Sequence, residues 1–165
     1  MSILSKLNTE LCPEKDREIF DQIPRNIYPL LNGFRVLVVD DNEDCLCMVK
    51  FILEEYLVEV KTAISANEAI EVIEMWNPDV LISDIGMPDK DGYWLIRTIR
   101  NFEALRSKFF PAIALTSYAY PEDCTKALDA GFQEVIFKPF DPDQLIAMVV
   151  KLAVGIDKAG LRFIK

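Results

Sequence analysis

Polar side chains that could act together follow four apolar runs of the sequence. Asp40 ends the run RVLVVD and Asp41 comes next, while Asp84 ends the similar run DVLISD. Thr116 ends the run PAIALT, and Lys138 follows the run EVIF. Three carboxylates that converge repel one another unless a cation neutralises them, and oxygen-only ligands suit a hard ion such as Mg²⁺. The sequence therefore predicts a magnesium site if the fold brings these runs together.

The same residue types fit the transfer of a phosphoryl group. A carboxylate can act as the nucleophile and form an aspartyl-phosphate. Such a transfer depends mostly on in-line positioning and on stabilisation of charge. Lys138 would bring a mobile positive charge to the phosphoryl oxygens, and Thr116 would supply a hydroxyl donor. Lys138 precedes Pro139, and a cis peptide at this bond, which costs little before proline, would aim the lysine inward.

The elements that must position these residues can be read from the alternation of apolar runs with segments of helical period. The predicted strands are 35–40, 58–63, 79–84, 111–116 and 134–137, and the predicted helices are 42–57, 65–76, 92–101, 121–131 and 141–153. Five βα units at this spacing predict an α/β fold, a doubly wound five-stranded parallel sheet with helices on both faces. Function in such sheets lies at the carboxyl ends of the strands, where the polar residues are expected to meet.

The composition excludes several other kinds of site. The chain has no histidine, so Ser-His-Asp and Cys-His catalysis are excluded, and a phosphohistidine would have to belong to a partner. A net charge of −9 argues against a nucleic-acid-binding surface. Cys45 and Cys47 do not have the spacing of a CxxC pair, so a zinc site is poorly supplied. Together with Cys12 and Cys124, they are expected to be reduced thiols.

Four segments in combination resemble the receiver domains of two-component response regulators. They are VLVVDDNED, DVLISDIGMPDKDG, IALTSYA and FKPF. The resemblance covers roughly residues 34–154. It is specific because of the combination of motifs: DD after the first strand, D-x-x-MP-x-x-DG after the third, TS after the fourth and KP after the fifth. It implies the flavodoxin-like (βα)₅ receiver fold. It divides the chain into an N-terminal extension over 1–33, partly helical near 14–22, a receiver domain over 34–154 and a C-terminal tail over 155–165.

The resemblance also assigns roles to single residues. Asp84 would be the phosphoacceptor, and Asp41, Asp84 and the backbone carbonyl of Gly86 would bind magnesium. Asp40 would contribute to the metal site through water or a hydrogen bond. Thr116 would be the switch hydroxyl, and Lys138 would contact the phosphate.

Partners follow from the same resemblance. A histidine kinase or a histidine phosphotransfer protein would donate the phosphoryl group, and a downstream protein would be the target. The chain would catalyse only its own phosphorylation and dephosphorylation, in the cytoplasm. Neither a signal peptide nor an apolar stretch of the roughly 20 residues needed to span a membrane is found, so no membrane partner is expected. Whether residues 1–33 dock on the receiver, mediate a homodimer or stay mobile is left open.

The chain departs from the receiver pattern at the position three residues before the lysine. Receivers usually carry a tyrosine or phenylalanine there, whereas this chain has Val135. A valine cannot report the state of Thr116 by a large change of rotamer, so Tyr118 or Tyr120 is expected to take over part of that role. Tyr118 is also bulky enough to cover the phosphoryl group, and Gly86 has no side chain to orient water, which predicts slow self-dephosphorylation.

Two alternatives remain beside a phosphorylated receiver. A degenerate receiver that binds partners without phosphorylation is favoured only by Val135. A phosphatase of the haloacid dehalogenase type would also use a nucleophilic aspartate, but that family needs a second aspartate two residues later, where this chain has Gly86.

Overall fold

The predicted sheet is present in the computed structural model, which describes residues 25–106, 109, 111–118, 120–154, 156–157 and 160–161. The predicted helix near 14–22 and Cys12 lie outside the described residues. The strands are β1 (Arg35–Val39), β2 (Glu59–Ala63), β3 (Val80–Asp84), β4 (Ala112–Thr116) and β5 (Glu134–Phe137). They form one sheet in the order β2-β1-β3-β4-β5, and every pair of neighbours is parallel. This confirms the doubly wound α/β fold.

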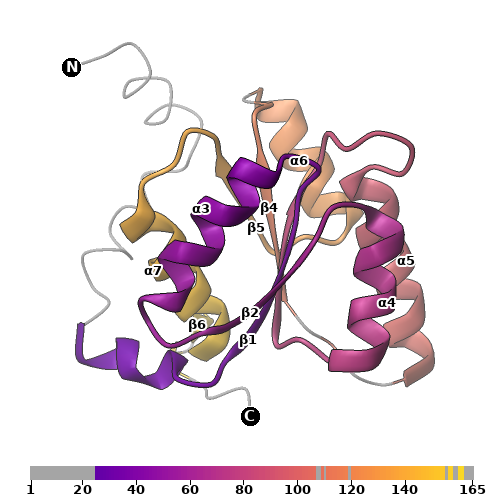
Figure 1. Cartoon of the computed structure of the whole chain (residues 1–165). Helices are drawn as coiled ribbons and strands as arrows, with labels where there is room; N and C mark the ends of the chain where they lie inside the picture. The colour runs from indigo at the N-terminus through magenta and orange to yellow at the C-terminus, as the bar shows by residue number, and fades with distance from the viewer. Residues whose placement is uncertain are drawn as a thin grey trace.

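Helices cover both faces of the sheet. They are α3 (Glu43–Glu54), α4 (Ala66–Trp76), α5 (Gly92–Arg106), α6 (Pro121–Ala130) and α7 (Pro142–Val154). α3 and α7 lie on one face, and α4, α5 and α6 lie on the other (Figure 1). Alternate residues of β1 serve the two cores, because side chains of a strand point to opposite faces. Val36 and Val38 pack toward α3 and α7, whereas Leu37 and Val39 pack toward the other helices.

The predicted helix caps are formed by local side chains. The Asn42 side chain accepts a hydrogen bond from the backbone N–H of Cys45 at the start of α3. The Ser65 hydroxyl accepts one from the backbone N–H of Glu68, whose carboxylate in turn accepts one from the backbone N–H of Ile64. These bonds satisfy N–H groups that have no partner within the helix. They fix where α3 and α4 begin, just after the carboxyl ends of β1 and β2.

Two predicted helix ends are wrong. α3 ends at Glu54 and does not reach 57, because Leu57 has a left-handed φ of 61° and its carbonyl accepts a hydrogen bond from Gly33. α5 continues to Arg106, beyond the predicted end at 101. The Arg100 guanidinium pairs with the Glu103 carboxylate one turn later at 2.6 Å, which supports the extra turn.

Two described segments lie outside the five βα units, one before β1 and one after α7. A 3-10 helix, η1 (Arg25–Leu31), precedes β1, and its Tyr28 ring meets Tyr56 edge to face at 5.4 Å. After α7, the short strands β6 (Ile156–Asp157) and β7 (Gly160–Leu161) pair antiparallel. Among the described residues, no helix has both the length and the apolar character that crossing a membrane requires.

Candidate functional site

The strand order reverses between β1 and β3, and the acidic residues lie at this point. β1 pairs with β2 on one side and with β3 on the other, so the chain moves outward to β2 and then crosses to the opposite side of β1. Asp40 and Asp41 follow β1, and Asp84 is the last residue of β3. One carboxylate oxygen of each lies within 4.8 Å of the others. The structure therefore brings together the three carboxylates that the sequence placed at separate strand ends.

Lys138 approaches the same cluster from the end of β5. Its Nζ donates a hydrogen bond to Asp40 Oδ2 at 2.7 Å and lies 3.6 Å from Asp84 Oδ1. Burial by itself would lower the pKa of Lys138, but the bond to Asp40 and the charge of Asp84 outweigh it and raise the pKa. The lysine is therefore held in its charged form between the two carboxylates.

The cluster is largely withdrawn from water. Asp40 and Asp84 expose 2% and 9% of their surface, whereas Asp41 is exposed. Burial raises the pKa of the Asp84 carboxyl, Lys138 opposes this, and the charges of Asp40 and Asp41 add to it. Asp40 is further fixed by a hydrogen bond from the backbone N–H of Asn42 to its Oδ1 at 2.9 Å. One lysine therefore faces three carboxylates, so the site has an excess of negative charge.

A magnesium ion fits this arrangement of donors. In an octahedral site with bonds of about 2.1 Å, opposite ligands lie about 4.2 Å apart. The carboxylate oxygens of Asp40, Asp41 and Asp84 converge within a similar span, and all are hard oxygen donors. The exposure of Asp41 leaves one side of the cluster open to water and phosphate oxygens, which a bound magnesium ion usually retains as ligands.

Thr116 ends β4, the strand beside β3, and is 1% exposed. Its Oγ1 accepts a hydrogen bond from the backbone N–H of Tyr118 at 3.1 Å. Its carbonyl accepts one from the backbone N–H of Lys138 at 2.8 Å, which links the ends of β4 and β5. The peptide between Lys138 and Pro139 is cis, as the sequence allowed.

Two glycines shape the loop after Asp84. A Cβ on Gly92 would lie 2.4 Å from the carbonyl oxygen of Asp84, so only a glycine lets the start of α5 pack against this backbone. A Cβ on Gly86 would lie 3.1 Å from the Tyr118 hydroxyl and 3.3 Å from its ring. The Tyr118 ring therefore lies directly over Gly86, although half of its surface is exposed. The sequence predicted a covering role for Tyr118 but did not reveal this contact.

Sequence reasoning missed a thiol beside the cluster. Cys45 lies in the first turn of α3, and burial together with a hydrogen bond to Asp40 raises its pKa to about 11. The thiol is therefore protonated and unreactive near neutral pH. Its position one helical turn after Asp41 is the signal that could have revealed it. The described cysteines, Cys45, Cys47 and Cys124, are free thiols, as predicted.

Val135 occupies an interior position in β5. It is 6% exposed and belongs to the core on the side of α4, α5 and α6. Its neighbour in the register is Ala114 of β4. Val135 is therefore a short, buried, branched side chain on the edge strand of the sheet, and it is too small for the large rotamer change of an aromatic ring.

The comparisons with known proteins agree with this geometry. Residues 36–150 match the model of the family described as response regulator receiver domain. The chain belongs to this family. The predicted receiver fold is confirmed at the same time, because the chemotaxis response regulator CheY4 of Vibrio cholerae matches this receiver with a TM-score of 0.67. The match covers 73% of this chain and 99% of CheY4, with 30% sequence identity.

Curated relatives extend the comparison. An uncharacterized 14.6 kDa protein in the sodA1 3' region of Leptolyngbya boryana is 42% identical over 114 residues, which are 69% of this receiver and 86% of that protein. The CAI-1 autoinducer sensor kinase/phosphatase CqsS of Vibrio cholerae is 33% identical over 141 residues, 81% of this receiver but 20% of CqsS. The chain also spans less than half the length of other curated relatives that it matches, such as the sensor protein GacS.

Proposed function

We propose that this receiver accepts a phosphoryl group on Asp84 from the phosphohistidine of a partner, in a magnesium-dependent reaction, and signals by changing its binding to a downstream protein. The partner would be a histidine kinase or a histidine phosphotransfer protein in the cytoplasm. The observation that carries the proposal is the convergence of Asp40, Asp41 and Asp84 with the Lys138 ammonium between two of them. Residues 34–154 would form the receiver, with 1–33 and 155–165 as appendages.

Each residue of the cluster has a distinct part in this reaction. An Asp84 carboxylate oxygen would attack the phosphorus while the bond from phosphorus to the donor nitrogen breaks. Asp41, Asp84 and the Gly86 carbonyl would hold the magnesium ion, with Asp40 contributing through its hydrogen bonds or a water. When bound, magnesium would offset the charge of the carboxylates and the phosphoryl oxygens.

Lys138 and Thr116 would bind the transferred group. Lys138 lies 3.6 Å from Asp84, within reach of an oxygen attached to that carboxylate. Thr116 would exchange its hydrogen bond from Tyr118 for one that its hydroxyl donates to the phosphoryl group. That exchange would release the backbone of Tyr118, and the Tyr118 ring over Gly86 would move with it. Val135 is buried in the core, so the readout would be carried by this loop.

The test is incubation with acetyl phosphate and Mg²⁺ followed by intact mass measurement. The proposal predicts a stable gain of about 80 Da, the mass of one phosphoryl group, and its absence in Asp84→Asn. Asp143→Asn, an exposed acid at the start of α7, is the matched control and should gain the same mass. Turnover of acetyl phosphate without a stable adduct would support a phosphatase, and no reaction at all would support a degenerate receiver.

A further inference from the structure

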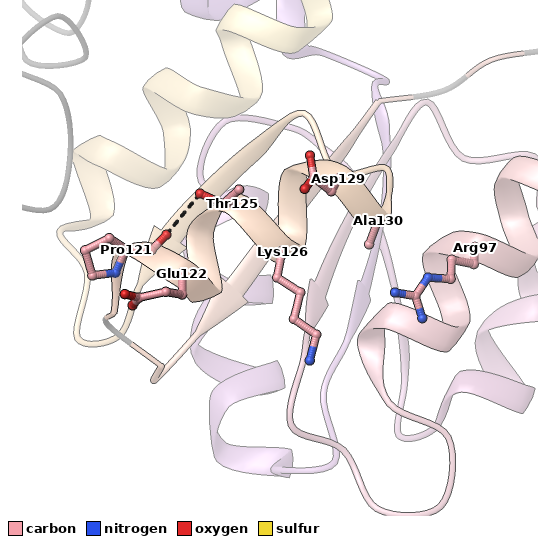
Figure 2. A pocket seen from close by; sticks show the side chains of 7 residues that line it. All are labelled: Arg97, Pro121, Glu122, Thr125, Lys126, Asp129 and Ala130. Carbon is pink, nitrogen blue, oxygen red and sulfur yellow. Dashed lines mark hydrogen bonds between the residues drawn. The ribbon is translucent and has the colours of Figure 1, made fainter.

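A groove of about 490 Å³ lies between α5 and α6, on the face of the sheet away from α3 and α7. Arg97 of α5 borders one side, and residues of α6 from Pro121 to Ala130 border the other (Figure 2). The groove is within the size range of ligand sites in proteins and larger than a simple anion requires. It lies outside the acidic cluster, and none of the roles proposed for that cluster uses it.

Two cations converge in this groove around one aromatic ring. Lys126 Nζ lies 4.4 Å from the centroid of the buried Tyr93 ring, and Arg97 Cζ lies 5.9 Å from the same centroid. Both side chains are exposed, and in the part of the chain that the structure describes neither forms an ion pair. Two like charges held near one ring, neither of them in an ion pair among the described residues, favour an anionic occupant.

The acidic side chains that border the groove form no ion pair with Arg97 or Lys126 in the described part of the chain. Glu122 and Asp129 also border the groove, but Figure 2 shows their carboxylates pointing away from the ends of Lys126 and Arg97. Apolar surface comes from Pro121 and Ala130. The chain as a whole carries a net charge of −9, so two cations without an ion pair among the described residues are a distinctive feature of its surface. Such complementarity selects partners and their orientation.

We propose that the groove between α5 and α6 docks a short acidic peptide segment of a partner protein, with Arg97 and Lys126 pairing with its carboxylates. Side chains that contain both carboxylate and apolar groups would match the two cations and the apolar border. Recognition of acidic motifs by paired basic side chains is a general mode of peptide binding.

The groove is connected to Asp84 through two tyrosines, and this part of the inference rests on the proposed function. Burial raises the pKa of Tyr93, and the charges of Asp123 and Asp91 and the nearby Tyr118 hydroxyl raise it further. The Tyr118 backbone N–H donates a hydrogen bond to the Thr116 hydroxyl, and the Tyr118 ring lies over Gly86. Gly86 is two residues after Asp84. A movement of Tyr118 on phosphorylation would therefore change the surroundings of the ring on which both cations rest.

The groove is tested with a labelled peptide in which glutamate and leucine alternate, by fluorescence anisotropy. We expect the double variant Arg97→Gln/Lys126→Gln to weaken binding about tenfold, since each exposed pair contributes modestly. The matched double variant Lys50→Gln/Lys61→Gln removes the same charge elsewhere and should stay within about twofold. Equal weakening in both variants would overturn the proposal. On addition of the peptide, the amide chemical shifts of residues 93–97 and 121–130 should change. Changes confined to other residues would also overturn the proposal.

Other occupants give different results. Displacement of the peptide by millimolar inorganic phosphate, or equal binding of a peptide with glutamine for glutamate, would overturn docking of an acidic peptide. Self-association in sedimentation that is lost in Arg97→Gln/Lys126→Gln would assign the groove to a second copy of the chain instead.

The coupling has its own readout. Treatment with acetyl phosphate and Mg²⁺ should change peptide affinity severalfold in the unaltered chain but not in Tyr118→Ala, with the mass adduct confirming phosphorylation of each. An adduct without a change in affinity would overturn the coupling alone. Absence of the adduct would overturn the proposed function and the coupling. Binding of the peptide to the unphosphorylated groove would still be decided by the comparison of Arg97→Gln/Lys126→Gln with Lys50→Gln/Lys61→Gln.

Discussion

The acidic cluster at Asp84 and the segment after β4 lie at the same edge of the sheet but are held by different forces. The cluster consists of carboxylate oxygens and the Lys138 ammonium, which lies 2.7 Å from Asp40 Oδ2 and 3.6 Å from Asp84 Oδ1. It is largely withdrawn from water. The segment after β4 is held by a hydrogen bond from the Tyr118 backbone N–H to the Thr116 hydroxyl and by the contact of Tyr118 with Gly86. Val135 contributes only packing. Chemistry at Asp84 therefore depends on a few fixed atoms, whereas its readout depends on a contact that a loop can make or break.

The largest expected effect is on the cluster. Lys138→Met should slow phosphorylation by acetyl phosphate about a hundredfold, because it removes the cation closest to the developing charge at Asp84. Lys50→Met, which removes a partly exposed lysine of α3, is the control and should leave the rate unchanged. Phosphorylation is followed by intact mass over time. A rate in Lys138→Met within about twofold of the unaltered chain would remove Lys138 from the reaction.

Val135 should affect stability and not chemistry. Val135→Ala removes two buried methyl groups from the core and should lower the free energy of unfolding by about 2 kcal/mol. The rate of phosphorylation under folding conditions should stay unchanged, because Val135 contributes no polar atom to the cluster. Urea unfolding and the mass assay measure the two quantities on one preparation. A changed phosphorylation rate with unchanged stability would reverse the assignment of Val135 to packing.

Tyr118 should affect the lifetime of the phosphorylated form. Tyr118→Ala uncovers Gly86 and should shorten the half-life of the adduct about tenfold, since water then reaches the phosphoryl group. Tyr120→Ala, whose ring is 72% exposed, is the matched control. The loss of the adduct after removal of acetyl phosphate is followed by mass. An unchanged half-life in Tyr118→Ala would count against shielding by this ring.

The smallest effect is on folding without metal. Burial raises the pKa of Asp84, so its ionisation above that pKa costs folding free energy, and the cost disappears as the pH falls toward the ordinary value of 3.8. With EDTA at pH 7, Asp84→Asn should therefore be about 1 kcal/mol more stable than the unaltered chain.

Magnesium and pH provide the controls for this effect. Adding Mg²⁺ should stabilise the unaltered chain more than Asp84→Asn, because the ion offsets a charge that the variant lacks. A variant that is less stable than the unaltered chain in EDTA would show that the converging carboxylates do not repel one another to a measurable extent.

Readout across the two regions can be compared directly by NMR. A phosphomimic such as beryllofluoride should shift amides of both 84–92 and 116–118 if Thr116 and Tyr118 move together. Shifts confined to 84–92 would separate the chemistry from the loop and contradict the role given to Tyr118.

Much of the fold and the cluster could be predicted because their signals are local. A strand buried on both faces is a continuous apolar run, as in β1 and β3. Caps such as Asn42 and Ser65 accept hydrogen bonds from backbone N–H groups three residues later, so they can be recognised from the sequence alone. The end of α5 was predicted wrongly because its last turn is supported by side-chain contacts of Arg100. Arg100 pairs with Glu103 and donates hydrogen bonds to the carbonyl of Gly131, which lies 31 positions away in the sequence.

The sequence by itself determined which residues end the strands, and parallel strands then bring Asp40, Asp41, Asp84, Thr116 and Lys138 to one edge of the sheet. Only the tertiary structure decided which of them touch: Lys138 reaches Asp40 from 98 positions away, and the Tyr118 ring lies over Gly86. It also decided that Arg97 and Lys126 share the Tyr93 ring. The physical reason is that strand ends follow from local hydrophobic patterns, whereas contacts between side chains depend on how separate helices and loops pack against each other.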